Sequence, residues 1–205
     1  FVHYEDMVQA EVLWLSRGID YDPALTAPVY MFNEYFGSGM SSIVFQTIRE
    51  SKALAYSTNA YFGTPRKKED PFFIQAYIGT QADKLKEAMD GMYELLTELP
   101  ESENMFAAAK AAIKSKIESE RIIRSSVLFN YETALRRGVE RDLREDVYRA
   151  IDDYTFESVR GFHKEYVSGK NYTMMVLGSR DKVDMETLKA YGEVEELTLE
   201  QVFGY

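Results

Sequence analysis

Cysteine is absent from the 205 residues, and histidine occurs only twice, as His3 and His163. Without thiols the chain has neither a disulfide framework nor thiolate chemistry, and the redox compartment stays open. A zinc site needs three or four ligands from His, Cys, Asp and Glu, and two scattered histidines do not form one. His163 lies within an expected helix, where we interpret it as a half-buried or surface residue and not as the base for a serine nucleophile.

Long apolar runs and an excess of positive charge are also missing. No run approaches the ~18 apolar residues that a membrane span needs. The 34 acidic and 24 basic residues give a formal net charge of −10. Such a charge repels phosphate backbones and anionic membranes, so we expect no nucleic-acid partner. Two roles are compatible with this negative charge. It keeps the protein soluble, or it forms an acidic surface that attracts basic peptides.

The chain is long enough to form one large domain with a well-buried core. Hydrophobic residues make up 45% and charged residues 28%, as in ordinary globular proteins. No repeat, low-complexity tract or linker divides the sequence, so we expect residues 1–205 to form a single domain. The chain begins Phe1-Val2-His3, without an initiator methionine or a signal-peptide pattern. We therefore expect it to be part of a longer polypeptide.

Hydrophobic periodicity separates the expected strands from the expected helices. The first part is predicted to contain a strand over 8–17 ended by Gly18, helices over 24–36 and from about Ser42, and strands over 54–62 and 71–79. Val8, Ala10, Val12 and Trp14 share one face of the first strand. The last two strands are expected to pair as an antiparallel hairpin with a charged loop.

The second half of the chain is predicted to be mostly helical. It is predicted to contain helices over 85–99, over 103–138 with a break between about 118 and 126, over 156–167 and after Asp184, and a buried strand over 171–179. Ser102 and Thr155 stand at cap positions. Strands first, then helices and a returning strand indicate an α+β fold, with an antiparallel-rich sheet and helices packed on one face.

The turn Gly37-Ser38-Gly39 lies between the first two expected helices and invites three interpretations as a catalytic loop. A P-loop requires a lysine after its second glycine, but Met40 follows Gly39. A dinucleotide loop needs a preceding strand and a third glycine where Ser42 stands, and a nucleophile elbow needs a different glycine spacing. We therefore expect Gly37 to end one helix, Ser41 or Ser42 to cap the next, and Gly37 or Gly39 to have positive φ.

Two further residues are candidates for chemistry. Arg49 falls near the end of the second expected helix, and Tyr56 lies at the start of the following strand. At neighbouring ends of two packed elements, a guanidinium and a phenol can converge as hydrogen-bond donors to a carbonyl oxygen that gains negative charge. The structural alternative is an ordinary strand tyrosine and a helix-end cation near the carbonyl pole.

The run FGSGMSSIVFQTIRESKALAYS resembles the second homologous half of the insulinase/pitrilysin-like zinc metallopeptidases, the inverzincins. Half-domains of that family commonly read Gly-Gly-Gly-Met-Ser-Ser-x-Leu-Phe, then Ile-Arg-Glu, then Gly-Leu-Ala-Tyr. The matching segments here are 37–42, Phe45, 48–50 and 53–56, with Ser38 and Ala53 in place of glycines. VQAEVLWLSRG and NYTMMVLG also resemble family strands, so the resemblance covers almost the whole chain. ELTLEQVFGY resembles the C-terminal end of long members.

The resemblance implies a LuxS/mitochondrial-processing-peptidase-like half-domain that forms the last domain of its polypeptide. Family members bind zinc through H-x-x-E-H and a later glutamate in their first half, and this chain lacks that pattern. Zinc is therefore expected in another domain and not in this one. Arg49 and Tyr56 are implied to bind the backbone of a peptide or unfolded protein, and the oxyanion formed when water attacks the peptide bond. Phe45 either lines a side-chain pocket or packs in the core.

Two functions are compatible with this resemblance. The first is the C-terminal domain of a zinc-dependent metalloendopeptidase, which works with a zinc-bearing N-terminal domain of the same or a partner chain. The second is a non-catalytic structural or partner-binding domain of the same fold. Non-catalytic members usually lose the arginine–tyrosine pair, so the presence of Arg49 and Tyr56 favours the first function.

Overall fold

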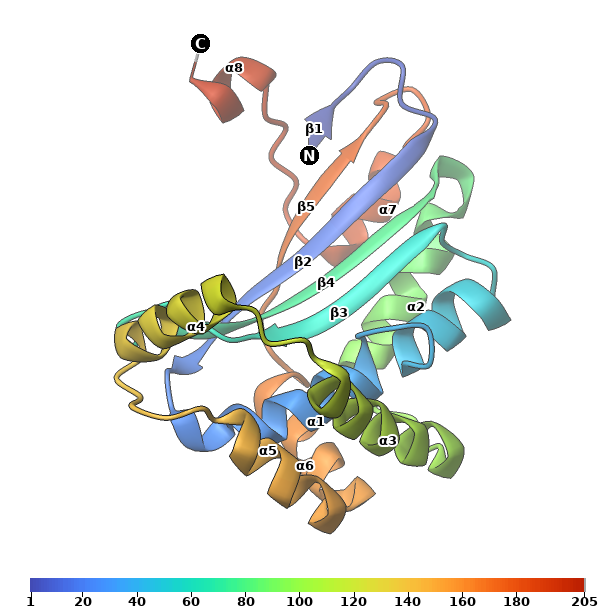
Figure 1. The fold of residues 1–205 in the computed structure, drawn as a ribbon. Helices are drawn as coiled ribbons and strands as arrows, with labels where there is room; N and C mark the ends of the chain where they lie inside the picture. Colours follow the sequence, from blue (N-terminus) through green and yellow to red (C-terminus); the bar gives the residue numbers. More distant parts are fainter. Residues whose placement is uncertain (205) are drawn as a thin grey trace.

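A computed structural model describes residues 1–204 and contains one five-stranded sheet (Figure 1). Its strands are β1 (Val2–His3), β2 (Gln9–Asp20), β3 (Ser57–Gly63), β4 (Pro71–Gln81) and β5 (Thr173–Gly178). Their order across the sheet is β1-β5-β2-β4-β3. Only β1 and β5 pair in parallel, and the other neighbours are antiparallel. The predicted α+β class, the antiparallel-rich sheet and the β3–β4 hairpin are confirmed.

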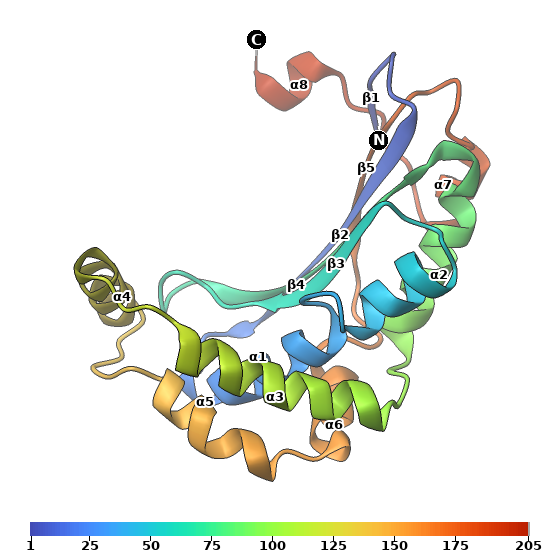
Figure 2. The ribbon, with the colours of Figure 1, turned by 45° about the vertical axis from the view of Figure 1, so that its right-hand side comes forward.

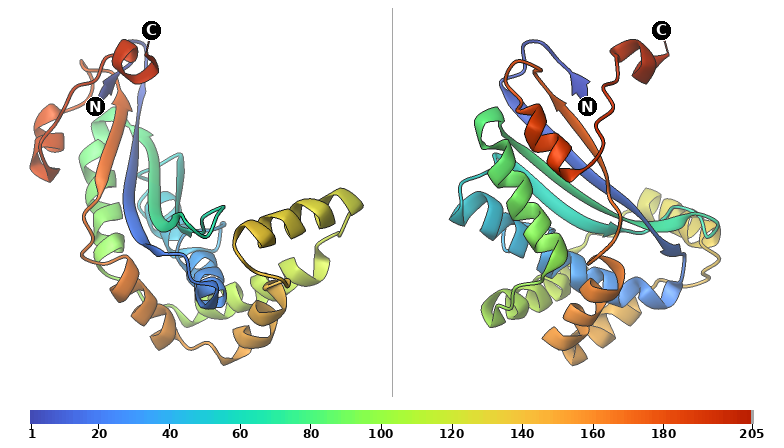
Figure 3. Two further views of the ribbon diagram at one scale, coloured as in Figure 1. Left: turned by 90° about the vertical axis from the view of Figure 1, so that its left-hand side faces the viewer. Right: turned by 180° about the vertical axis from the view of Figure 1, so that it is seen from behind.

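Helices cover one face of the sheet. They are η1 (Pro23–Leu25), α1 (Thr26–Phe36), η2 (Phe45–Ser51), η3 (Ala82–Lys84), α2 (Leu85–Thr97), α3 (Glu103–Ser119), α4 (Arg124–Arg136), α5 (Arg144–Ala150), η4 (Ile151–Asp153), α6 (Phe156–Tyr166), α7 (Met185–Tyr191) and α8 (Leu199–Phe203). In Figures 2 and 3, α2 and α7 lie on one side of the sheet, and α1, α3, α5 and α6 gather at one end. The other side is open between α4, which stands beyond the β3–β4 turn, and α8, which lies at the opposite end of the sheet.

The core lies between the sheet and these helices. Alternate residues of the central strands are buried, namely Ala10, Val12 and Trp14 of β2 and Phe72, Ile74, Ala76 and Ile78 of β4. In β3 the ring of Phe62 lies 5.2 Å from that of Phe72 and 5.1 Å from that of Phe162 in α6. Residues of the opposite parity, such as Leu13 and Tyr77, are only partly buried and form the open face.

Two details of the first strand differ from the prediction. Strand β2 does not end at Gly18 but continues to Asp20, with a register shift between Arg17 and Asp20. A Cβ at Gly18 would lie 2.9 Å from the carbonyl oxygen of Phe72, so this glycine lets the paired strands approach closely. Val8 precedes the strand and is 68% exposed, because the ladder with β4 starts at Gln9.

The predicted helix boundaries are largely confirmed. The Ser102 hydroxyl accepts a hydrogen bond from the Met105 amide and caps α3, and Thr155 and Asp184 cap α6 and α7. The break expected between about 118 and 126 separates α3 from α4 at residues 120–123. None of the helices in residues 1–204 is long and apolar enough to cross a membrane.

Candidate functional site

The glycine turn positions the segment that carries the candidate residues. Gly39 has a φ of +103°, which confirms the expected positive φ. Gly37 ends α1 with an amide that donates to the Asn33 carbonyl, but its φ is −146°. A Cβ there would lie 2.0 Å from the carbonyl oxygen of Ala60. Glycine is therefore required at 37 because the end of α1 touches the backbone of β3, and not because of a left-handed conformation.

The next helix begins at Ser42, as predicted. Its buried hydroxyl donates to the Gly39 carbonyl at 2.8 Å, and accepts from the Phe45 amide at 3.4 Å. Residues 43–44 are α-helical, and η2 continues as a π-helix in which the Lys52 amide donates to the Thr47 carbonyl. A π-helix is rare, and it occurs frequently at functional sites. The sequence pattern does not distinguish it from an α-helix.

Arg49 lies on the solvent side of η2, while its neighbour Ile48 is fully buried. The guanidinium carbon lies 4.9 Å from the centroid of the Phe45 ring, a cation–π contact. Its only ion pair among the described residues is a loose one with Glu50, at 3.8 Å and with both side chains about half exposed. Such a pair contributes little, so the donors of Arg49 remain free for a ligand. Phe45 is half-buried, and its ring packs against the guanidinium.

A short loop links Arg49 to Tyr56, and hydrogen bonds hold it at several points. The Leu54 amide donates to the Ile48 carbonyl at 2.9 Å, and the Leu54 carbonyl accepts from the buried Thr80 hydroxyl. The Tyr56 amide donates to the Gly79 carbonyl at 2.9 Å. Within this loop Ala53 has a φ of +49°, the only positive value at a non-glycine in residues 1–204. This is one of the two positions at which the family pattern has glycine and this chain has another residue.

Tyr56 itself lies just outside the predicted strand. Strand β3 begins at Ser57, and the Tyr56 side chain is 57% exposed instead of sharing the inner face with Ala60 and Phe62. Its phenol oxygen accepts a hydrogen bond from Nε2 of Gln81 at 3.2 Å, at the end of β4. The phenol O–H therefore stays available as a donor.

Arg49 and Tyr56 are thus both exposed and both attached to a rigid part of the core, but no hydrogen bond or ion pair joins them within residues 1–204. Two surface hollows, of about 560 and 410 Å³, lie elsewhere, against α6 and against α5. Gln81 and Thr80 could not be identified from the sequence as neighbours of the candidate residues. They come next to the Leu54–Tyr56 loop because Ser57 pairs with Gly79 across the hairpin, and no local motif marks that register.

The residues of this chain do not fit a catalytic zinc ion. In residues 1–204 no group of three or more His, Cys, Asp or Glu side chains is placed to hold a metal. His163 is buried, and its Nε2 donates to the Leu95 carbonyl at 2.9 Å, while its ring packs against Phe32 and Phe36. Burial lowers its pKa below the ordinary 6.5, and the hydrogen bond to Leu95 opposes this. It is a core residue, more deeply buried than predicted.

The family is established by a match over more than half of the sequence. A family model described as the peptidase M16 inactive domain matches residues 1–113. The chain therefore belongs to the peptidase M16 inactive domain family. This confirms the resemblance to the non-zinc half of the insulinase/pitrilysin-like peptidases.

Particular relatives agree with this assignment. The uncharacterized zinc protease YmxG of Bacillus subtilis is 26% identical over 164 residues, covering 77% of this chain and 38% of YmxG. A peptidase M16 inactive domain from Pseudomonas fluorescens superposes with a TM-score of 0.72 at 17% identity, over 89% of this chain and 43% of that one. The inactive peptidase domain of a Bordetella parapertussis protein gives 0.66 at 14% identity, over 84% and 93%. The chain thus spans about two fifths of the length of the first two relatives.

Proposed function

We propose that this domain supplies Arg49 and Tyr56 to the substrate site of a zinc-dependent metalloendopeptidase whose metal is bound by another domain. The proposal rests on the exposure and the hydrogen bonding of these two side chains. Both are exposed hydrogen-bond donors without a strong internal partner, and both are attached to the core through buried neighbours. Stabilisation of a developing negative charge requires hydrogen-bond donors that are not already used inside the protein, and in this proposal the two side chains converge on the substrate. Membership of the peptidase family supports the same function.

In this proposal the two side chains bind the substrate backbone and act at the scissile carbonyl. The Arg49 guanidinium is always charged and offers several N–H donors, and Tyr56 offers one O–H. As water attacks the peptide bond, the carbonyl oxygen becomes an oxyanion, and these donors bind it more tightly than they bind the ground state. Phe45 holds the guanidinium in place and lines the adjacent side-chain subsite. The substrate class is a peptide or an unfolded protein segment.

The zinc-bearing domain lies on the same or a partner chain in this proposal, and this domain alone has no hydrolytic activity. The second candidate is a non-catalytic domain that supports a partner, and the description of the family as an inactive domain is compatible with both candidates. The two candidates differ in what Arg49 and Tyr56 do. Only the first requires them in the transition state.

The test replaces each donor in the assembled enzyme. Arg49→Ala and Tyr56→Phe should each lower the rate of peptide cleavage by roughly 10²–10³, the scale found when one oxyanion donor is removed. Both side chains are largely exposed, so thermal unfolding of the variants should match the unmodified protein. Tyr93→Phe is the matched control: this exposed tyrosine of α2 contacts the ring of Tyr191, and the loss of its hydroxyl should keep the full rate. Unchanged rates for Arg49→Ala and Tyr56→Phe would favour the non-catalytic role.

A further inference from the structure

Helix α4 presents its apolar side to solvent. Val127, Leu128, Tyr131 and Leu135 are each more than half exposed, and their spacing places them along one side of the helix. On the opposite side Ser126 and Thr133 are less exposed, but Phe129 is 62% exposed, and α4 has no buried residue. A surface helix normally turns its apolar stripe toward its own core. Because α4 buries no residue, this row of side chains, named here the α4 stripe, is left exposed among residues 1–204.

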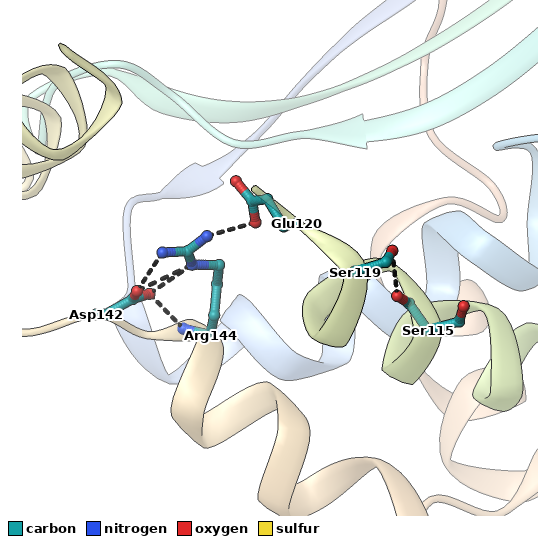
Figure 4. Close-up of polar contacts among 5 residues, drawn as sticks. All are labelled: Ser115, Ser119, Glu120, Asp142 and Arg144. Atoms are coloured by element: carbon teal, nitrogen blue, oxygen red, sulfur yellow. Dashed lines mark hydrogen bonds and ion pairs between the residues drawn. The ribbon is translucent and has the colours of Figure 1, made fainter. Parts of the chain in front are cut away.

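Contacts at the C-terminal end of α4, and between the outer ends of its two connecting loops, restrain the helix. At its C-terminal end the Arg137 side chain donates to the Pro65 carbonyl at 2.8 Å, and the Lys68 amide donates to the Arg136 carbonyl at 3.1 Å. Beyond the two connecting loops, Arg144 of α5 forms ion pairs with Glu120, which follows α3, and with Asp142 (Figure 4). The helix is therefore fixed at a defined place beyond the β3–β4 turn, which lowers the entropic cost of docking.

The N-terminal end of α4 carries positive charge without a counter-ion. Residues 121–137 contain four arginines and one glutamate, a net charge of +3 in a chain of net charge −10. Arg121 and Arg124 are exposed and have no hydrogen bond or ion pair within residues 1–204. They stand at the positive pole of the helix, where cations are unfavourable, and Ile123 provides no side-chain cap. Carboxylates from a partner would pair with the two arginines, offset the positive charge at this pole of the helix and accept hydrogen bonds from its uncapped amides.

We infer that α4 is the docking helix for the zinc-bearing domain. The stripe would enter an apolar groove on that domain, and carboxylates at one end of the groove would bind Arg121 and Arg124. This inference rests on the proposed function, which joins this chain to such a domain. YmxG and the Pseudomonas fluorescens protein each have more than half of their length outside the matched part, enough for a domain of similar size. Helix α4 lies on the side of the open face of the sheet, away from α2 and α7 (Figures 2 and 3).

Photocrosslinking in the assembled enzyme tests which surface covers the stripe. A photoreactive phenylalanine analogue placed at Leu128 should crosslink to peptides of the domain that carries the zinc ligands, identified by mass spectrometry. The same analogue at Tyr93, an equally exposed site on α2, should give no such crosslink. Crosslinks from position 128 to a second copy of residues 1–205, or to no protein, would overturn the inference.

A charge reversal at Arg124 distinguishes an effect on docking from an effect on the stability of α4. Arg124→Glu places an anion at the positive end of α4, so the free chain should unfold at a slightly higher temperature. In the assembled enzyme the same substitution should reduce crosslinking from position 128 roughly tenfold or more, because like charges would then face each other. Lys170→Glu, an exposed control between α6 and β5, should change neither result. Equal crosslinking by Arg124→Glu and the unmodified enzyme contradicts the inference, whatever the rates of the Arg49 and Tyr56 variants.

Discussion

Single residues in the loop between η2 and β3 show how the site is held. Ala53 adopts a left-handed conformation, with a φ of +49°, that costs an L-residue roughly 1–2 kcal/mol. Ala53→Gly removes this strain but increases the freedom of the unfolded chain, which opposes part of the gain. We expect the free energy of unfolding to rise by up to ~1 kcal/mol. Urea denaturation measures this free energy. Ala55→Gly, at a residue without positive φ, is the control and should lower it. Loss of stability in Ala53→Gly would show that the strain is absent.

His163 makes stability depend on pH. Its pKa is lowered in the folded state by burial, so the unfolded chain binds the proton more readily. The stability that neutral His163 contributes is therefore complete above the ordinary pKa of 6.5 and is lost as the pH falls below it toward the folded pKa. In urea denaturation between pH 7.5 and 5.0, His163→Gln should show a shallower fall in the free energy of unfolding than the unmodified chain. An equal fall in the two proteins would contradict the prediction.

The sequence indicates the candidate donors but not their surroundings. Arg49 and Tyr56 are found from their types and their places at the ends of two elements, together with the family resemblance. The contact of Gln81 with Tyr56 depends on hairpin register over a charged loop, and that of Phe45 with Arg49 depends on a side-chain conformation. Neither leaves a pattern along the chain. Whether Arg49 and Tyr56 act together remains a prediction for the rate measurements.

Among the elements, the contact between α1 and β3 depends on one glycine. Gly37→Ala would place a Cβ 2.0 Å from the backbone oxygen of Ala60, far inside van der Waals contact, so α1 or β3 must shift. We expect a loss of ~3 kcal/mol or more in the free energy of unfolding, on the scale of strongly overpacked cores. Gly161→Ala in α6 is the matched control, because no atom lies within 4 Å of the added Cβ. That control should gain roughly 0.5–1 kcal/mol from helix propensity. Equal stability of the two variants, measured by urea denaturation, would show that α1 and β3 are not in close contact.

Hydrophobic periodicity predicts most helices and strands correctly. It fails where contacts with distant parts of the chain determine the bounds or the type of an element. The inner faces of β2 and β4 and the caps of α3, α6 and α7 follow from residue spacing and type. Strand β2 extends past Gly18 because its partner strand β4 continues, and a strand partner is not visible locally. The π-helical η2 has the same apolar spacing as an α-helix, since one buried Ile48 fits both. Helix α4 follows the predicted break, but the exposure of its apolar residues was not predicted, because it depends on where the helix lies relative to the core.

At the scale of the whole molecule, the asymmetry of the sheet is the main functional feature. Helices cover one face, and the other face is open, with α4 beside it (Figures 2 and 3). Leu13 and Tyr77 on the open face are only partly buried, and the α4 stripe is exposed. Exposed apolar surface often marks a site of protein interaction. The arrangement therefore supports the proposal that this domain is completed by a second one.

The proposal also makes a prediction about the isolated chain as a whole. Hydrolytic zinc needs three protein ligands and an open position, and residues 1–204 bring no such cluster together. We expect the purified chain to retain no stoichiometric zinc after dialysis and to cleave no fluorogenic peptide, while still folding cooperatively. Elemental analysis, a peptidase assay and thermal unfolding on the same sample measure all three. Stoichiometric zinc together with turnover would contradict the prediction and place the metal site in this domain. Addition of the zinc-bearing domain should produce activity, and that activity should depend on Arg49 and Tyr56.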